Sequence, residues 1–173
     1  MISVLILLLV NLWYEVDGRR WAYAGCGLNL TTLPPMWQDI VRQAMQTWNG
    51  AGSTFHFDEE AGQNSVVCFN QGRWNGRLGL TQSVPQTRDA LLRRANTVLN
   101  TFWQFDPPHP DEVGAQYGVP YDLQTVVAHE LGHMLVLKHS TDEGALMHPV
   151  LPSGLQKGLS QDDVDGIRYL YRS

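Results

Sequence analysis

Apolar residues recur with the spacing of an amphipathic helix in three separate parts of the chain. The first stripe follows the helix-start residues 31–35 and is closed by Gly50. The second begins at about Leu123, with Asp122 as its N-cap, and the third follows Ser160, whose side chain is a good N-cap. The pattern therefore predicts three helices. The apolar members of the first stripe are Trp37, Ile40, Val41, Ala44, Met45 and Trp48.

Five shorter segments have the composition or the alternation of β-strands. Residues 65–69 are almost wholly apolar, which is typical of a central strand covered on both sides. Residues 78–84 are more polar and predict an edge strand. The other strands are predicted over residues 21–30, 53–58 and 95–103. This order of strands and helices favours an α/β or α+β fold, with helices packed on a twisted, mostly parallel sheet.

The first ten residues are almost wholly apolar. The run is too short for a membrane span and fits the apolar part of a secretory signal. We therefore expect a separate N-terminal segment over residues 1–18, a single domain over residues 19–173, and an exported protein. The alternatives are a short segment that associates with a membrane, over residues 1–14, and a hydrophobic strand of the domain.

Composition and charge narrow the class of protein. The chain is 43% hydrophobic and 17% charged, which is enough apolar material for one core. Its formal charge is −5 and no run of Lys or Arg stands out, so a nucleic-acid partner is disfavoured. The two cysteines, Cys26 and Cys68, form no CxxC pair, which excludes sulfur-ligated zinc. The sequence is compatible with a disulfide between them and equally with two buried thiols.

The sequence His129-Glu130-Leu-Gly-His133 places two imidazoles four residues apart, on one face of the second predicted helix. Such a pair can bind zinc, and an isolated pair can also be a chance match on an exposed helix. His139 follows six residues later, and Met147 lies in an apparent tight turn. A zinc ion with three protein ligands keeps a fourth position open for water, as catalytic sites require. Glu130 can accept that water's proton and return it to a leaving amine.

The segments HELGHMLVLKHS and ALMHP resemble the metzincin clan of zinc peptidases. Ser140 after the third histidine and the terminal LSQDDVDGIRYLY are similar to the matrixins within that clan. YDLQTVVAHELGH and VLNT resemble secreted microbial members, and the likeness covers roughly residues 20–173. It implies a metzincin-like fold: a twisted, mostly parallel five-stranded sheet with one antiparallel edge strand and three helices. It also implies a zinc-dependent endopeptidase, which we expect to be monomeric and to act on protein or peptide substrates.

The resemblance also assigns roles to individual residues. It makes His129, His133 and His139 zinc ligands, Glu130 the general base, and Met147 a packing residue beneath the metal. An extended peptide would dock on the edge strand by β-augmentation. Residues 149–152 would wall the pocket for the side chain after the scissile bond. The implied substrate-binding residues are Leu78, Gly79, Leu80, Pro149 and Val150, and Asp162 or Asp163 would brace the methionine turn from below.

Val136 departs from the family pattern, because a glycine stands at this position in the extended motif. That glycine ends the helix and turns the chain toward the third histidine, since glycine tolerates a positive φ. A β-branched residue there costs on the order of 1–3 kcal/mol. The third ligand, His139, is therefore the least secure of the three. The alternative functions are a pseudo-protease that binds peptide or protein without cutting and a zinc hydrolase acting on another amide.

The aspartate-rich calcium loop of animal matrixins is not evident in the sequence. In the proline-rich segment 106–120, Asp106, Asp111 and Glu112 could bind Ca²⁺, but a solvated loop is the favoured interpretation. We expect His56 to face solvent on its strand and His109 to lie at the surface.

Overall fold

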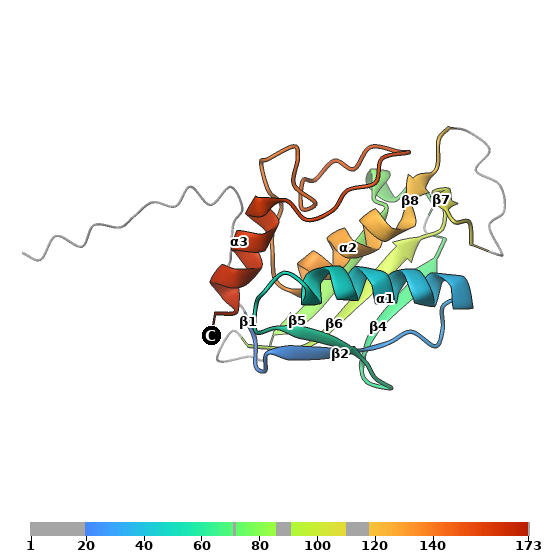
Figure 1. The fold of residues 1–173 in the computed structure, drawn as a ribbon. Coiled ribbons are helices and arrows are strands. Elements are labelled where there is room, and N and C mark those ends of the chain that lie inside the picture. Colours follow the sequence, from blue (N-terminus) through green and yellow to red (C-terminus); the bar gives the residue numbers. More distant parts are fainter. Residues whose placement is uncertain (1–19, 71, 86–90, 110–117, 173) are drawn as a thin grey trace, which may run out of the picture.

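Two long helices lie side by side over a twisted sheet, and a third stands at one end of it (Figure 1). They are α1 (Pro35–Asn49), α2 (Leu123–Met134) and α3 (Gln161–Leu170), so the three predicted helices are confirmed. The computed structural model describes residues 20–70, 72–85, 91–109 and 118–172. Within these residues, no helix is long and apolar enough to cross a membrane. The N-terminal segment 1–18 lies outside them, and its separation from the domain stays a prediction.

The sheet combines parallel strands with one antiparallel edge strand, as predicted. Strands β6, β4, β2 and β3 neighbour one another in that order and run parallel, whereas β5 pairs with β6 in the antiparallel sense. The strands are β1 (Arg20–Trp21), β2 (Gly25–Asn29), β3 (His56–Glu59), β4 (Asn64–Phe69), β5 (Gly79–Pro85) and β6 (Leu91–Asn100). In the part of the chain that the structure describes, the sheet has six strands instead of five, because the chain bends after Trp21 and divides the segment predicted at 21–30 into β1 and β2.

Helix α1 buries the apolar stripe that its sequence predicts. Pro35 occupies the first turn, where a missing backbone N–H costs nothing, and Gly50 follows the last turn. Trp37 and Trp48 are almost fully buried. The indole Nε1 of Trp48 donates to the backbone carbonyl of Ala128 at 2.8 Å, which ties α1 to the middle of α2.

Strand β4 is central in the sheet, but it is not covered on both faces as its apolar sequence predicts. Val66 is fully buried, whereas Phe69, three residues along and on the opposite face, is 56% exposed. The physical reason is the arrangement of the long helices, because α1 and α2 both lie over the same side of the sheet (Figure 1).

A two-stranded parallel ladder, β7 (Phe105–Asp106) with β8 (Tyr121–Asp122), brackets the proline-rich segment. Asp106 is exposed, and Asp111 and Glu112 lie outside the described residues. The solvated loop favoured for this segment, rather than a calcium site, therefore stays a prediction. The ladder leads directly into α2, so it helps to fix where the helix that carries the histidines begins.

The cysteines lie on different strands, and within the described residues no disulfide joins them. Cys26 is buried on β2, and its burial raises the pKa of the thiol to about 12. Cys68 on β4 contacts His109, with 3.3 Å between Sγ and Nε2. The rings of His109 and Trp37 meet edge to face at a centroid distance of 4.9 Å, so His109 lies at the surface but is half-buried. The structure thus favours two thiols over a disulfide.

Candidate active site

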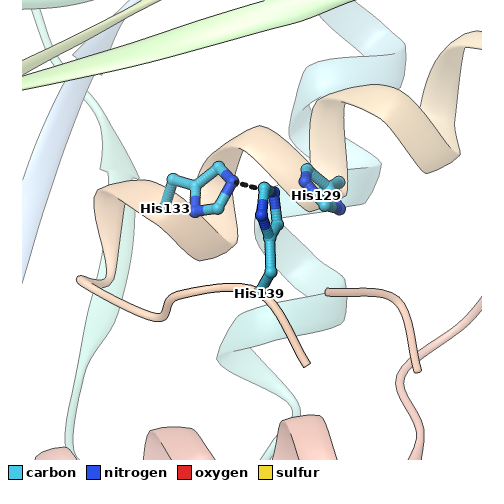
Figure 2. Close-up of side chains that lie close together, drawn as sticks. All are labelled: His129, His133 and His139. Atoms are coloured by element: carbon cyan, nitrogen blue, oxygen red, sulfur yellow. Dashed lines mark hydrogen bonds between the residues drawn. The ribbon is translucent and has the colours of Figure 1, made fainter. Parts of the chain in front are cut away.

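Helix α2 carries the first two histidines and begins at a side-chain cap. The carboxylate of Asp122 accepts a hydrogen bond from the backbone N–H of Thr125 at 2.7 Å, as the sequence predicts. His129 and His133 follow one turn apart on the same face, and Figure 2 shows both rings directed to one point. His139 reaches the same point from the loop after the helix.

The chain leaves α2 through a tight left-handed turn. The N–H of Leu137 donates to the carbonyl of Gly132, and that of Val136 donates to the carbonyl of His133, each at 3.0 Å. This pair of bonds is the Schellman arrangement, which needs a residue with positive φ just after the helix. Val136 fills that position with φ of 72°. The backbone geometry expected of a glycine is therefore kept by a valine, with the strain that a β-branched residue carries there.

Two side chains from distant parts of the chain hold this turn in place. The indole Nε1 of Trp21 donates to the carbonyl of Met134 at 2.7 Å, and the hydroxyl of Tyr171 donates to the carbonyl of Leu135 at 3.1 Å. Both carbonyls belong to the end of α2, where no further turn of helix can satisfy them. These buried bonds, together with the burial of the Val136 side chain, offset the backbone strain.

The three imidazoles converge closely enough that they could hold one metal ion. One ring nitrogen from each of His129, His133 and His139 lies within 4.8 Å of the others. The Nε2 atoms of His133 and His139 are 3.2 Å apart. Two nitrogen ligands of one tetrahedral zinc ion stand about 3.3 Å apart. The donor set therefore fits zinc.

Backbone carbonyls orient the two helical rings. The carbonyls of Leu146 and Leu137 lie 2.8 Å from the Nδ1 atoms of His129 and His133. Because a carbonyl only accepts, each Nδ1 carries the hydrogen and each Nε2 keeps its lone pair for a metal. Burial lowers the pKa of His129 to about 3 and that of His133 to about 4, and it also lowers the pKa of His139. All three imidazoles are thus neutral at pH 7, the form that binds metal.

The methionine turn packs directly beneath the helix. Met147 is 1% exposed, and a Cβ added to Gly132 would collide with its sulfur. Glycine in the H-E-x-x-H segment therefore allows the turn to approach α2, a requirement that the helical pattern did not reveal. After Met147, the nearest neighbour of a Cβ at Gly132 would be the indole of Trp48 on α1. The methionine turn, α2 and α1 therefore meet at one glycine.

The two acidic residues at the start of α3 have different partners. The carboxylate of Asp163 accepts from the backbone N–H groups of Leu146 at 2.8 Å and Met147 at 3.0 Å. It also closes the capping box with Ser160. Asp162 instead accepts from the hydroxyl of Ser140, the residue after the third histidine, at 2.6 Å. Asp163 thus supports the methionine turn, and Asp162 contacts the segment of His139.

Glu130 is 6% exposed and lies beside the histidines. Its burial raises the pKa of the carboxyl to about 7, and a hydrogen bond from Thr81 acts in the opposite direction. A carboxyl with a pKa near neutrality suits a group that accepts and then returns a proton. Thr81 was not among the predicted site residues, because nothing in the sequence relates it to Glu130, which lies 49 residues further along the chain.

A groove of about 620 Å³ runs between strand β5 and the segment after the methionine turn. The side of β5 contributes Leu78, Gly79 and Leu80, and the opposite side contributes Pro149 and Val150. The predicted substrate-binding residues therefore line one groove. Glu130 lines the same groove, together with the three histidines His129, His133 and His139. His56 is exposed on β3, as predicted.

Comparison with protein families agrees with this geometry. The family model described as Matrixin matches residues 31–172, which is most of the chain. The chain belongs to the matrixin family. Matrixins are zinc metalloproteases, so zinc is the metal that the three histidines of this matrixin fit.

Curated relatives match a shorter part of the chain. Metalloendoproteinase 1 of Glycine max is 52% identical over 52 residues, which is 30% of this chain and 17% of the relative. Interstitial collagenase of Sus scrofa is 57% identical over 51 residues, 30% of this chain and 11% of the relative. The matched part of the chain spans less than a fifth of either relative's length. These matrixins come from a plant and an animal, so the expected closeness to secreted microbial members stays a prediction.

The left-handed turn of this matrixin predicts an unusual order of stability at position 136. We expect Val136→Gly to be more stable than Val136→Ala by about 1 kcal/mol, because alanine is strained at positive φ and glycine is not. At a helical position with negative φ, the order is the reverse. Urea unfolding of both variants measures the difference, and a more stable Val136→Ala would contradict the turn.

The buried imidazole predicts a pH-dependent difference in stability. In the metal-free protein, we expect His129→Gln to gain stability relative to the parent as the pH falls from about 7 to 4. The unfolded parent binds a proton at His129 with a pKa of 6.5, whereas the folded parent binds it only near pH 3. Acid therefore favours the unfolded parent, and the variant lacks this proton. Urea unfolding with a chelator present measures the difference, and a difference constant with pH would contradict the prediction.

Proposed function

We propose that this chain is a zinc-dependent endopeptidase whose metal is held by His129, His133 and His139, with Glu130 as general base. The observation that carries the proposal is the convergence of the three rings beside a buried carboxyl, on the wall of a groove. Membership of the matrixin family supports the same reaction. The names of the curated relatives, which include metalloendoproteinases and collagenases, agree with it.

The groove supports an extended polypeptide as the substrate. Among the described residues, strand β5 pairs only with β6, so its other edge keeps backbone N–H and C=O groups for a peptide. Pro149 and Val150 face it from the other side, and Leu151, Tyr121 and Val126 add apolar lining. A peptide strand added to β5 would place the carbonyl groups of the peptide beside Glu130. An apolar side chain of the peptide would contact the apolar lining of the groove.

Glu130 would carry the proton during hydrolysis. Its carboxylate takes a proton from the attacking water and gives it to the leaving amine, so one group serves both steps. Burial favours this role, because it raises the pKa of the carboxyl toward neutrality. Zinc, when bound by the histidines, supplies Lewis-acid polarisation of the scissile carbonyl and acidifies water.

Two other functions have less support. A pseudo-protease would need a damaged site, yet Glu130 is present and the turn at Val136 keeps the geometry that brings His139 to the other ligands. A zinc hydrolase of another amide would not need the free edge of β5. We therefore favour cleavage of peptide bonds within proteins or peptides.

We further propose that the protein is exported and monomeric, with residues 1–18, which begin with an apolar run of ten residues, as the signal. Its support is the composition of that segment and the family of the domain. N-terminal sequencing of protein recovered from culture medium tests export, and retention of the whole chain inside cells would contradict it.

Loss of the base is the direct test of the reaction. We expect the full chain to cleave a quenched fluorescent peptide library, and Glu130→Gln to lose roughly 100-fold or more of that activity. Glutamine keeps the size of the side chain and removes the proton acceptor. Both proteins are compared at the same zinc content, because a variant that had only lost its metal would also lose activity.

Glu143→Gln is the matched control. It makes the same chemical change in an exposed loop, and Glu143 does not line the groove. Its activity should equal that of the parent. Equal activity of the parent and Glu130→Gln would exclude Glu130 as the base, and a zinc-loaded parent that cuts no peptide would favour the pseudo-protease.

A further inference from the structure

The side chain of Glu130 is held against the edge strand by contacts beyond the metal site. The Oε2 atom of Glu130 accepts a hydrogen bond from the hydroxyl of Thr81 at 2.8 Å. The same hydroxyl is 2.9 Å from the backbone carbonyl oxygen of Glu130. Two residues earlier on the same face of β5, a Cβ added to Gly79 would lie 2.8 Å from Oε1. Thr81 therefore contacts one carboxylate oxygen, and Gly79 leaves room for the other.

A second hydroxyl lies against the first. Thr97 on β6 is the cross-strand partner of Thr81, and their Oγ1 atoms are 2.7 Å apart. Thr97 is fully buried. A hydroxyl has one hydrogen to donate. If Thr97 donates to Thr81, the hydrogen of Thr81 is directed to Glu130. The three groups then form a chain of hydrogen bonds that ends on the carboxylate.

This chain of bonds has a consequence for the two oxygens of Glu130. Oε2 is occupied by Thr81, so Oε1 is the oxygen that remains to meet a water molecule in the groove. The carboxylate plane is fixed by a rigid strand pair instead of by solvent. A base that is already oriented loses less entropy when it reaches its reacting geometry.

We propose that Thr81 is a positioning residue for the general base, which holds Glu130 through Oε2 and leaves Oε1 to accept the proton. This inference rests on the proposed function, since it assigns a partner to the base of the same reaction. Thr81 itself touches neither the metal ligands nor the reacting atoms in this scheme. It acts only through Glu130, and its effect belongs to the chemical step.

The test compares Thr81→Val with Thr81→Ser. Valine keeps the branched shape of threonine and removes the hydroxyl, whereas serine keeps the hydroxyl and removes a methyl group. We expect kcat to fall roughly tenfold in Thr81→Val, the size of a lost hydrogen bond to a charged group. KM should change less than about twofold, because peptide docking uses the backbone of β5. Thr81→Ser should restore most of kcat.

Thr47→Val is the matched control for the substitution itself. Thr47 lies on α1, and its hydroxyl donates to the carbonyl of Gln43 at 3.0 Å, far in sequence from Glu130. It should leave kcat and KM unchanged. A kcat of Thr81→Val equal to that of the parent, or a loss that serine does not restore, would overturn the proposal.

Crystal structures of the parent and Thr81→Val give a readout that does not depend on activity. We expect the carboxylate of Glu130 to bind Thr81 in the parent and to rotate or become disordered in the variant. An unchanged carboxylate would overturn the positioning role, even if the parent proved inactive on every peptide. A parent that cuts no peptide while Glu130 still rotates in the variant would refute the proposed function alone.

Discussion

The left-handed turn after α2 is the constraint on which the metal site depends. Two histidines of a helix can meet one metal by spacing alone, but the third must be carried back by a sharp reversal of the chain. The turn at Val136 makes that reversal, with φ of 72°. The indole of Trp21 and the hydroxyl of Tyr171 bind the carbonyls just before it. Partners from both ends of the domain thus help to keep a strained residue in the conformation that brings His139 to the site.

The edge strand contributes to the groove in two ways. Its outer edge is the proposed docking site for a peptide, while its inward face meets the carboxyl of Glu130 through Gly79 and Thr81. The proposed substrate site and the proposed base are therefore positioned by one strand, which is paired along its length with β6. The burial that raises the pKa of the Glu130 carboxyl comes from the same packing. The position and the proton affinity of this carboxyl share one structural origin.

Local patterns were enough to predict the helices, the edge strand and the H-E-x-x-H segment. The caps at Asp122 and Ser160 involve residues only three apart, so the sequence alone carries them. The exposed face of β4 was not predictable, because it depends on where two helices pack. Neither was the contact of Thr81 with Glu130, nor the closeness of Gly132 to the methionine turn, since each joins segments that no periodic pattern relates.

X-ray absorption at the zinc edge, on protein loaded with one equivalent of zinc, tests whether all three histidines bind the metal. We expect three imidazole nitrogens and one oxygen around the metal. We also expect His139→Ala to remove one of the three imidazoles while His129 and His133 stay bound. Only two imidazoles in the parent, or no change in His139→Ala, would show that the turn at Val136 does not deliver the third ligand.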